Sequence, residues 1–80
     1  MNKLVGKVTQ VKRLGASYYG NPYHQIAIED AQGEITIVRT QIDSGINYAI
    51  NNPEYKEHTH EFRLTRAMRV FDAKCVEVDA

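Results

Sequence analysis

The chain of 80 residues is short of cysteine, of long apolar runs and of net charge. Its single cysteine, Cys75, excludes an internal disulfide, and a small domain without one fits a reducing cytoplasm. The longest apolar runs are two or three residues, far below the roughly 20 needed to cross a bilayer. Lys3 and Lys7 interrupt the first apolar residues, so we expect no signal peptide and a cytoplasmic protein.

Ten Lys and Arg balance ten Asp and Glu. A net charge of zero excludes a polybasic protein that binds nucleic acid by charge alone, so any basic surface must be local. With 42% hydrophobic residues, 25% charged residues and two prolines, the composition is that of a folded chain. We expect one domain over residues 1–80. Such a small domain must use nearly every apolar side chain in its core, which requires a closed or covered sheet.

Signatures of catalysis are missing as well. Neither Ser17 nor Ser44 lies in a G-x-S-x-G pattern, and no phosphate loop, H-E-x-x-H or dinucleotide-binding glycine pattern occurs. Cys75 lies in an apolar stretch, 73–78, where we expect a small core residue and not a nucleophile. The sequence therefore predicts a protein that is not an enzyme and carries no cofactor.

Periodic apolar residues predict five strands and one helix. The first strand, 4–14, changes phase near Gly6 or Gln10 and should be bent. The next two, around 23–28 and 35–37, form a hairpin with Gly33 as its positive-φ residue. Asp43 and Ser44 then offer an N-cap to one short helix that ends before Pro53. The last two strands cover 59–65, with Phe62 and Leu64 facing inward, and 68–78, with a phase break near 72–73.

Five strands with a helix between the third and the fourth predict a mainly β fold. This element order resembles the oligonucleotide/oligosaccharide-binding (OB) fold, a five-stranded Greek-key barrel whose second and third strands and flanking loops form the ligand face. Another small β-barrel and a helix-on-sheet α+β domain share the order and stay open as alternatives.

Within residues 20–54, the segments GNPYHQIAIED, RTQ and YAINNPE resemble short uncharacterised proteins encoded by bacteriophages and prophages, notably of actinobacteria. The resemblance brings no assigned catalytic or binding residues. It implies a phage-type accessory protein that acts in the cytoplasm of a host cell.

Charge is unevenly distributed along the chain. Residues 1–28 hold four basic residues and no acid, residues 29–61 hold seven acids against two basic residues, and residues 62–74 hold four basic residues against one acid. In a five-stranded barrel we expect the loop after strand 1 to lie near the loop between strands 4 and 5. The basic residues Lys12, Arg13, Arg66 and Arg69 should then come together.

The loop at residues 15–23 is rich in glycine and contains three tyrosines, Tyr18, Tyr19 and Tyr23. Ring faces stack on bases while nearby cations hold phosphates, the combination that a single-strand binder needs. In the alternative, Tyr18 or Tyr19 caps the open end of the barrel. The candidate nucleic-acid-binding residues are Tyr18, Tyr19, Tyr23, Lys12, Arg13, Arg39, Arg63, Arg66 and Arg69.

The sequence supports three other interpretations. Tyrosine and arginine are also enriched at protein interfaces, so the alternative partner is a host or phage protein, bound through the tyrosines and the acidic face. An open edge on strand 1 or strand 5 would allow a homo-oligomer. His58 and His60 with Glu57 or His24 suggest a zinc site, but we expect exposed histidines at a strand edge and no bound metal.

Overall fold

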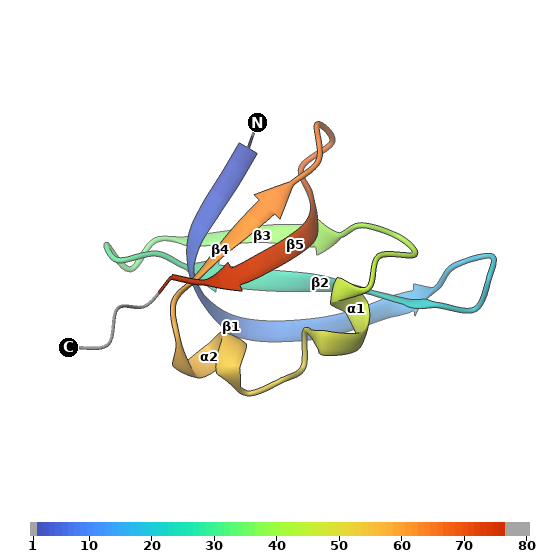
Figure 1. Ribbon diagram of the computed structural model, residues 1–80, viewed down its shortest axis with the longest axis horizontal. Coiled ribbons are helices and arrows are strands. Elements are labelled where there is room, and N and C mark those ends of the chain that lie inside the picture. The colour runs from blue at the N-terminus through green and yellow to red at the C-terminus, as the bar shows by residue number, and fades with distance from the viewer. Residues whose placement is uncertain (1, 77–80) are drawn as a thin grey trace.

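The structure is a computed structural model that describes residues 2–76 (Figure 1). The segments with alternating apolar residues form five strands. The strands are β1 (Asn2–Ala16), β2 (Pro22–Glu29), β3 (Ile35–Thr40), β4 (His60–Leu64) and β5 (Arg69–Cys75). Two short helices, α1 (Ile46–Ala49) and α2 (Glu54–Glu57), lie between β3 and β4. No helix in the described part of the chain is long and apolar enough to cross a membrane.

The strands close into a barrel in the order β1-β2-β3-β5-β4. Neighbours are antiparallel except β3 and β5, which run parallel. The N-terminal half of β1 pairs with β4 and its C-terminal half pairs with β2, so this one strand bends around the barrel. The predicted mainly β fold, a closed five-stranded OB-like barrel with its helical segment between strands 3 and 4, is confirmed.

The bend of β1 lies where the apolar phase changes. Leu4 and Val8 pack on the core before a register shift between Val8 and Gln10, and Val11 packs on it afterwards. Just before the bend, Gly6 approaches β2 so closely that a Cβ there would lie 2.2 Å from the carbonyl oxygen of Glu29. Glycine is therefore required for β1 to pass from β4 to β2.

The helix predicted before Pro53 is present as α1, but a second helix of four residues, α2, follows it and was not predicted. The N-cap of α1 is Gly45 and not Asp43 or Ser44, although the Ser44 hydroxyl accepts from the main-chain N–H of Ile46 at 3.4 Å. Asp43 instead adopts a φ of 63° in the preceding turn. α1 ends at Ala49 with Ile50 as its C-cap, and Pro53 is the N-cap of α2.

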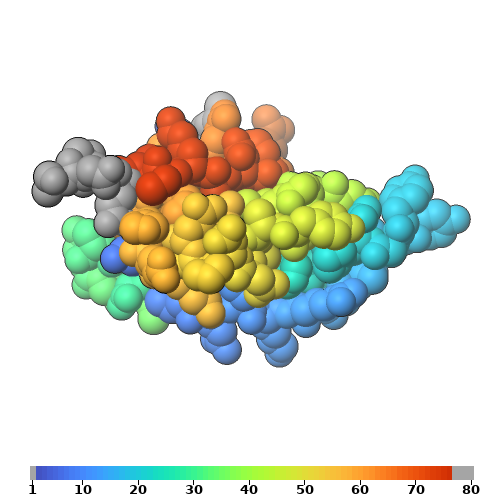
Figure 2. Space-filling view, turned by 60° about the horizontal axis from the view of Figure 1, so that its bottom comes forward, coloured from blue at the N-terminus to red at the C-terminus, as the bar shows by residue number. Residues whose placement is uncertain are grey.

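The core lies inside the barrel and under the helices. Its buried members are Val8, Ile26, Ile28, Val38, Ile46, Ile50, Tyr55, Phe62, Leu64 and Val70. The inward direction of Phe62 and Leu64 confirms the alternation predicted for β4. Figure 2 shows the two helical segments side by side across the near face of the molecule, and their Ile46, Ile50 and Tyr55 belong to the core.

A buried polar network joins α1 to the barrel. The Asn47 side-chain amide donates to the carbonyl oxygens of Gln41 and Ser44, at 2.9 and 3.2 Å. Its oxygen therefore faces His24 Nδ1 at 2.9 Å and accepts from Thr40 Oγ1 at 2.5 Å. Because an amide oxygen only accepts, His24 carries its proton on Nδ1.

The last strand is shorter than predicted. It begins at Arg69 and ends at Cys75, and residues 77 and 78 of the predicted strand lie outside the described residues. The phase break comes at Phe71, where β5 has one residue more than β4. Cys75 is exposed, so the prediction of a core thiol is wrong. The positive φ predicted for Gly33 is confirmed at 82°.

Candidate functional site

The tyrosine loop, residues 17–21, joins β1 to β2 and projects beyond the end of the barrel (Figures 1 and 2). Two hydrogen bonds from main-chain N–H groups close it, from Ser17 to the Asn21 carbonyl at 2.7 Å and from Gly20 to the Ser17 carbonyl at 2.9 Å. Tyr18 is 95% exposed and Tyr19 is 78% exposed. The alternative in which one of them caps the barrel is therefore wrong.

The two rings contact each other edge to face, with 5.3 Å between their centroids. Side chains of the neighbouring turn hold the base of the loop. The Asp43 carboxylate accepts from Ser17 Oγ at 2.5 Å and from Asn21 Nδ2 at 2.8 Å, and both bonds lower the pKa of Asp43. The loop thus has a fixed base and free aromatic tips.

Tyr23 differs from the other two tyrosines. It pairs with Gly15 across β1 and β2 and is half-buried. Its hydroxyl lies 3.2 Å from the position that a Cβ on Gly15 would take, so the ring packs over the glycine. Tyr23 shares its strand face with Gln25, because side chains two residues apart point the same way. It therefore connects the tyrosine loop to the outer surface of the sheet.

Three of the predicted cations form a row across four strands. Lys12 is opposite Gln25, Gln25 is opposite Arg39, and Arg39 is opposite Arg69. Side chains of neighbouring residues in a strand point to opposite faces. The neighbours of Gln25, Arg39 and Arg69 are buried in the core, so the row lies on the outer surface. These buried neighbours are Ile26, Val38 and Val70. Lys12, Gln25, Arg39 and Arg69 are called the basic row below.

The other predicted cations lie elsewhere. Arg13 is exposed near the base of the tyrosine loop, where its Nε donates to the Gly15 carbonyl at 3.4 Å. Arg66 lies in the turn between β4 and β5, which points away from the tyrosine loop (Figure 1). The prediction that these two loops lie near each other is therefore wrong. Lys12 and Arg69 do share the basic row through the barrel register, but Gln25 and Arg39 lie between them.

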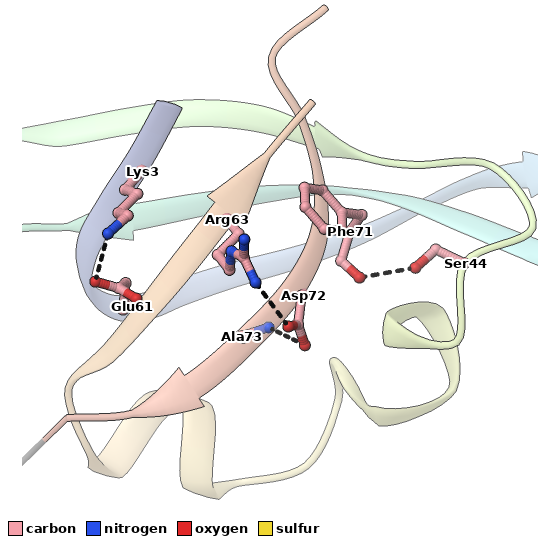
Figure 3. Close-up of polar contacts among 7 residues, drawn as sticks. All are labelled: Lys3, Ser44, Glu61, Arg63, Phe71, Asp72 and Ala73. Carbon is pink, nitrogen blue, oxygen red and sulfur yellow. Dashed lines mark hydrogen bonds and ion pairs between the residues drawn. The ribbon is translucent and has the colours of Figure 1, made fainter. Parts of the chain in front are cut away.

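Arg63 belongs to a different surface. It extends from β4 toward the carboxylate of Asp72, 4.0 Å away, and its guanidinium lies 5.7 Å from the centroid of the Phe71 ring (Figure 3). On the same surface Lys3 pairs with Glu61 at 3.6 Å, and the Ser44 hydroxyl donates to the Phe71 carbonyl at 3.1 Å. These opposite charges form a solvated ladder on β1, β4 and β5, and Arg63 does not join the basic row.

A hollow of about 180 Å³ lies beside the basic row. Its lining is Gln10, Lys12, Gln25, Ile26, Ala27 and Ile37. This is smaller than the roughly 300–1,000 Å³ of pockets that hold a whole drug-sized ligand, so it suits one part of a longer molecule. Sequence reasoning missed Gln10, Gln25 and Ile37. The outward phase of the two glutamines is readable from the pattern, but Ile37 is exposed although Ile35 and Ile37 alternate as an apolar face. The adjacency of all three residues depends on the register of three strands.

A second hollow, of about 480 Å³, lies around the turn between β2 and β3. The charged residues that line it are Lys7, Glu29 and Asp30. Asp30 is already used by the turn, because its Oδ1 accepts from the main-chain N–H groups of Gln32 and Glu34 at 2.9 Å each. Two carboxylates make this end unfavourable for a phosphate chain.

The histidines do not form a metal site. His60 is only 3% exposed, against the prediction of an exposed side chain, because its ring packs on Tyr55 and Phe62. Its Nδ1 lies 2.9 Å from the carbonyl oxygen of His58, and His24 belongs to the network with Asn47. Residues 2–76 contain no cluster of three or more His, Cys, Asp or Glu that could hold a metal ion.

No family model, curated protein or solved structure matches this chain. The resemblance to phage-encoded proteins stays a prediction.

Proposed function

We propose that this protein is a small non-enzymatic module that binds single-stranded nucleic acid on the outer surface of β1, β2 and β3. The observation that supports the proposal is the position of the basic row, which begins on β1 and β2, the two strands that the loop with the exposed tyrosine pair joins, and continues on β3 and β5. Aromatic rings and cations along one surface are what a chain of bases and phosphates requires.

Each part of the surface has a different role in this proposal. Tyr18 and Tyr19 offer free ring faces and edges on which unpaired bases stack. Tyr23 extends the aromatic track onto the sheet, where Lys12, Arg39 and Arg69 neutralise phosphates. The small hollow beside the row accepts one base against Ala27 and Ile37, within reach of the Gln10 and Gln25 amides. Bases in a duplex are already stacked and paired, so single strands are preferred.

The distribution of charge also supports a direction for the bound strand. The basic row contains three cations and no acid. Glu29 and Asp30 lie at the other end of β2 and β3, near the turn between these two strands. A phosphate chain gains from the first region and is repelled by the second. We therefore expect the bound nucleic-acid strand to run from the tyrosine loop across the basic row, and not toward the turn between β2 and β3.

The test is a fluorescence-anisotropy titration of labelled single-stranded and duplex oligonucleotides at low and near-physiological salt. Saturable binding that prefers single strands and weakens with salt is expected. Arg39→Ala should weaken binding of all sequences and reduce the slope of log K against log salt by about one. Arg63→Ala is the matched control, because Arg63 lies beside Asp72 on another surface. Absence of binding at low salt would refute the proposal.

A second candidate is a protein partner of host or phage that binds the same surface. The exposure of Ile37, 63%, beside the basic row favours it, because an apolar side chain contributes little to phosphate binding. Affinity for a protein partner should depend weakly on salt. Binding of a protein in a pull-down at high salt, together with no oligonucleotide binding, would select this candidate.

A further inference from the structure

β3 is unpaired along part of one of its edges. β3 pairs with β2 from Ile35 to Arg39, but β5 pairs with β3 only at Arg39 and Thr40. Within the described residues, no strand pairs with the other edge of β3 at residues 35–38. The sequence suggested an open edge on strand 1 or strand 5, and these strands are also paired along only part of each side. β1 pairs with β4 up to Gly6 and with β2 from Lys7 onward, and β5 pairs with β3 only at Arg69 and Val70.

Two hydrogen bonds identify which main-chain groups face this open edge. The Asp30 N–H donates to the Glu34 carbonyl at 3.0 Å, which directs the even-numbered groups of β3 toward β2. The Gln41 N–H donates to the Val70 carbonyl at 2.7 Å, which directs the odd-numbered groups toward β5. Successive residues of a strand alternate in this direction. The N–H and C=O groups of Ile35 and Ile37 therefore point to the open edge.

The open segment lacks the features that usually protect a strand edge. Natural edges carry lysines, prolines or bulges that prevent pairing with another chain. Residues 35–38 read Ile-Thr-Ile-Val, without charge, proline or a bulge. Ile35 and Ile37 are 55% and 63% exposed, so apolar side chains stand beside the unpaired main chain. A net charge of zero adds no general repulsion between copies.

We propose that this edge pairs with the same edge of a second copy, which gives a two-fold dimer with β3 antiparallel to its partner. Only the main-chain groups of Ile35 and Ile37 point to the open edge. The register in which all of these groups form hydrogen bonds places Ile35 opposite Ile37 of the second copy. Each such pair exchanges both hydrogen bonds. The two-fold axis then passes between the two Thr36 residues. The isoleucines of both copies also cover one another. The edge is therefore complementary to itself both in its side chains and in its main-chain hydrogen bonds, which favours a second copy as the partner.

The first test is the mass in solution over a concentration series, measured by light scattering or sedimentation. The wild type should be a dimer that dissociates on dilution. Ile37→Lys should be monomeric, because it places a cation at the apolar centre of the interface. Ile42→Lys is the matched control, since Ile42 is also exposed, at 42%, but lies outside β3, and it should stay dimeric. Circular dichroism checks that each variant keeps its fold, and Ile37→Thr, a strand-forming residue, replaces Ile37→Lys if it does not.

The second test fixes the register. In a Cys75→Ser background, Thr36→Cys should form a disulfide-linked dimer on mild oxidation. Directly opposite residues that are not hydrogen-bonded lie about 4.5 Å apart at Cα, within the range that a disulfide spans. Ile42→Cys in the same background should not cross-link above background. A wild type that stays monomeric at millimolar concentration, or a folded Ile37→Lys variant that remains dimeric, overturns the proposal.

Discussion

Replacing both Tyr18 and Tyr19 with alanine tests the proposed function at the point where the structure is most specific. The two side chains are 95% and 78% exposed, and the hydrogen bonds that close the loop are made by its main chain. Stacking contributes about 1–3 kcal/mol per base, so loss of one stacked ring should weaken binding roughly 5- to 160-fold. Loss of both should abolish detectable binding at near-physiological salt. Thermal stability should change by less than about 0.5 kcal/mol, as for other exposed substitutions.

The assay compares oligonucleotide affinity and thermal unfolding for three proteins. They are the wild type, the double alanine variant and a double phenylalanine variant of the same positions. Phenylalanine keeps the ring and removes the hydroxyl, so it should retain most of the affinity if stacking is the interaction. Alanine variants that bind as well as the wild type would refute the stacking role. A double alanine variant that loses several kcal/mol of stability would instead show that the tyrosines support the fold.

Three other substitutions and one control test the structure itself. Gly6→Ala should destabilise the protein by about 3 kcal/mol or more in urea unfolding, because its Cβ would lie 2.2 Å from the Glu29 carbonyl oxygen, whereas Gly45→Ala, with open space around it, should be nearly neutral. Asn47→Leu should cost on the order of 3 kcal/mol in the same measurement, since it leaves buried partners without their hydrogen bonds. Asp43→Asn should lower Tm at neutral pH and not at low pH. The pKa of Asp43 lies below its ordinary 3.8, so its contribution is present above that pH and lost as the pH falls through the lower, folded-state pKa.

The strands were predictable because their signal is local. Phe62 and Leu64 alternate with polar neighbours, and that period of two is sufficient to assign a half-buried strand. The bend of β1 was also readable, since an alternation that changes phase requires an extra residue. The helical segment was harder. Two helices of four residues give too few turns for a period to appear, and Pro53 is compatible with both the end of one helix and the start of the next.

The errors at single residues have one physical cause. Cys75 and His60 are opposite each other on paired strands, yet the thiol is exposed and the imidazole is buried. Average preferences place cysteine inside and histidine outside. The ring of His60 is buried because Tyr55 of α2 packs against it, a contact between segments that no local pattern reveals.

The candidate site divides in the same way. Glycine-flanked tyrosines are visible in the sequence, and so are the basic segments. Only the barrel register shows that Lys12, Arg39 and Arg69 share a row while Arg63 and Arg66 do not. The register also shows which isoleucines stand beside an unpaired main chain.

The sequence by itself determined the class of fold, the order of the strands, the bend in the first strand and the chemistry of the tyrosine loop. These features depend on interactions between residues close in the chain, where period and turn residues are sufficient. The tertiary structure alone decided which cations meet, which tyrosines stay in water and which strand keeps an open edge. Those outcomes depend on how distant strands align, and a shift of one residue between two strands would turn the side chains of the shifted strand to the opposite face.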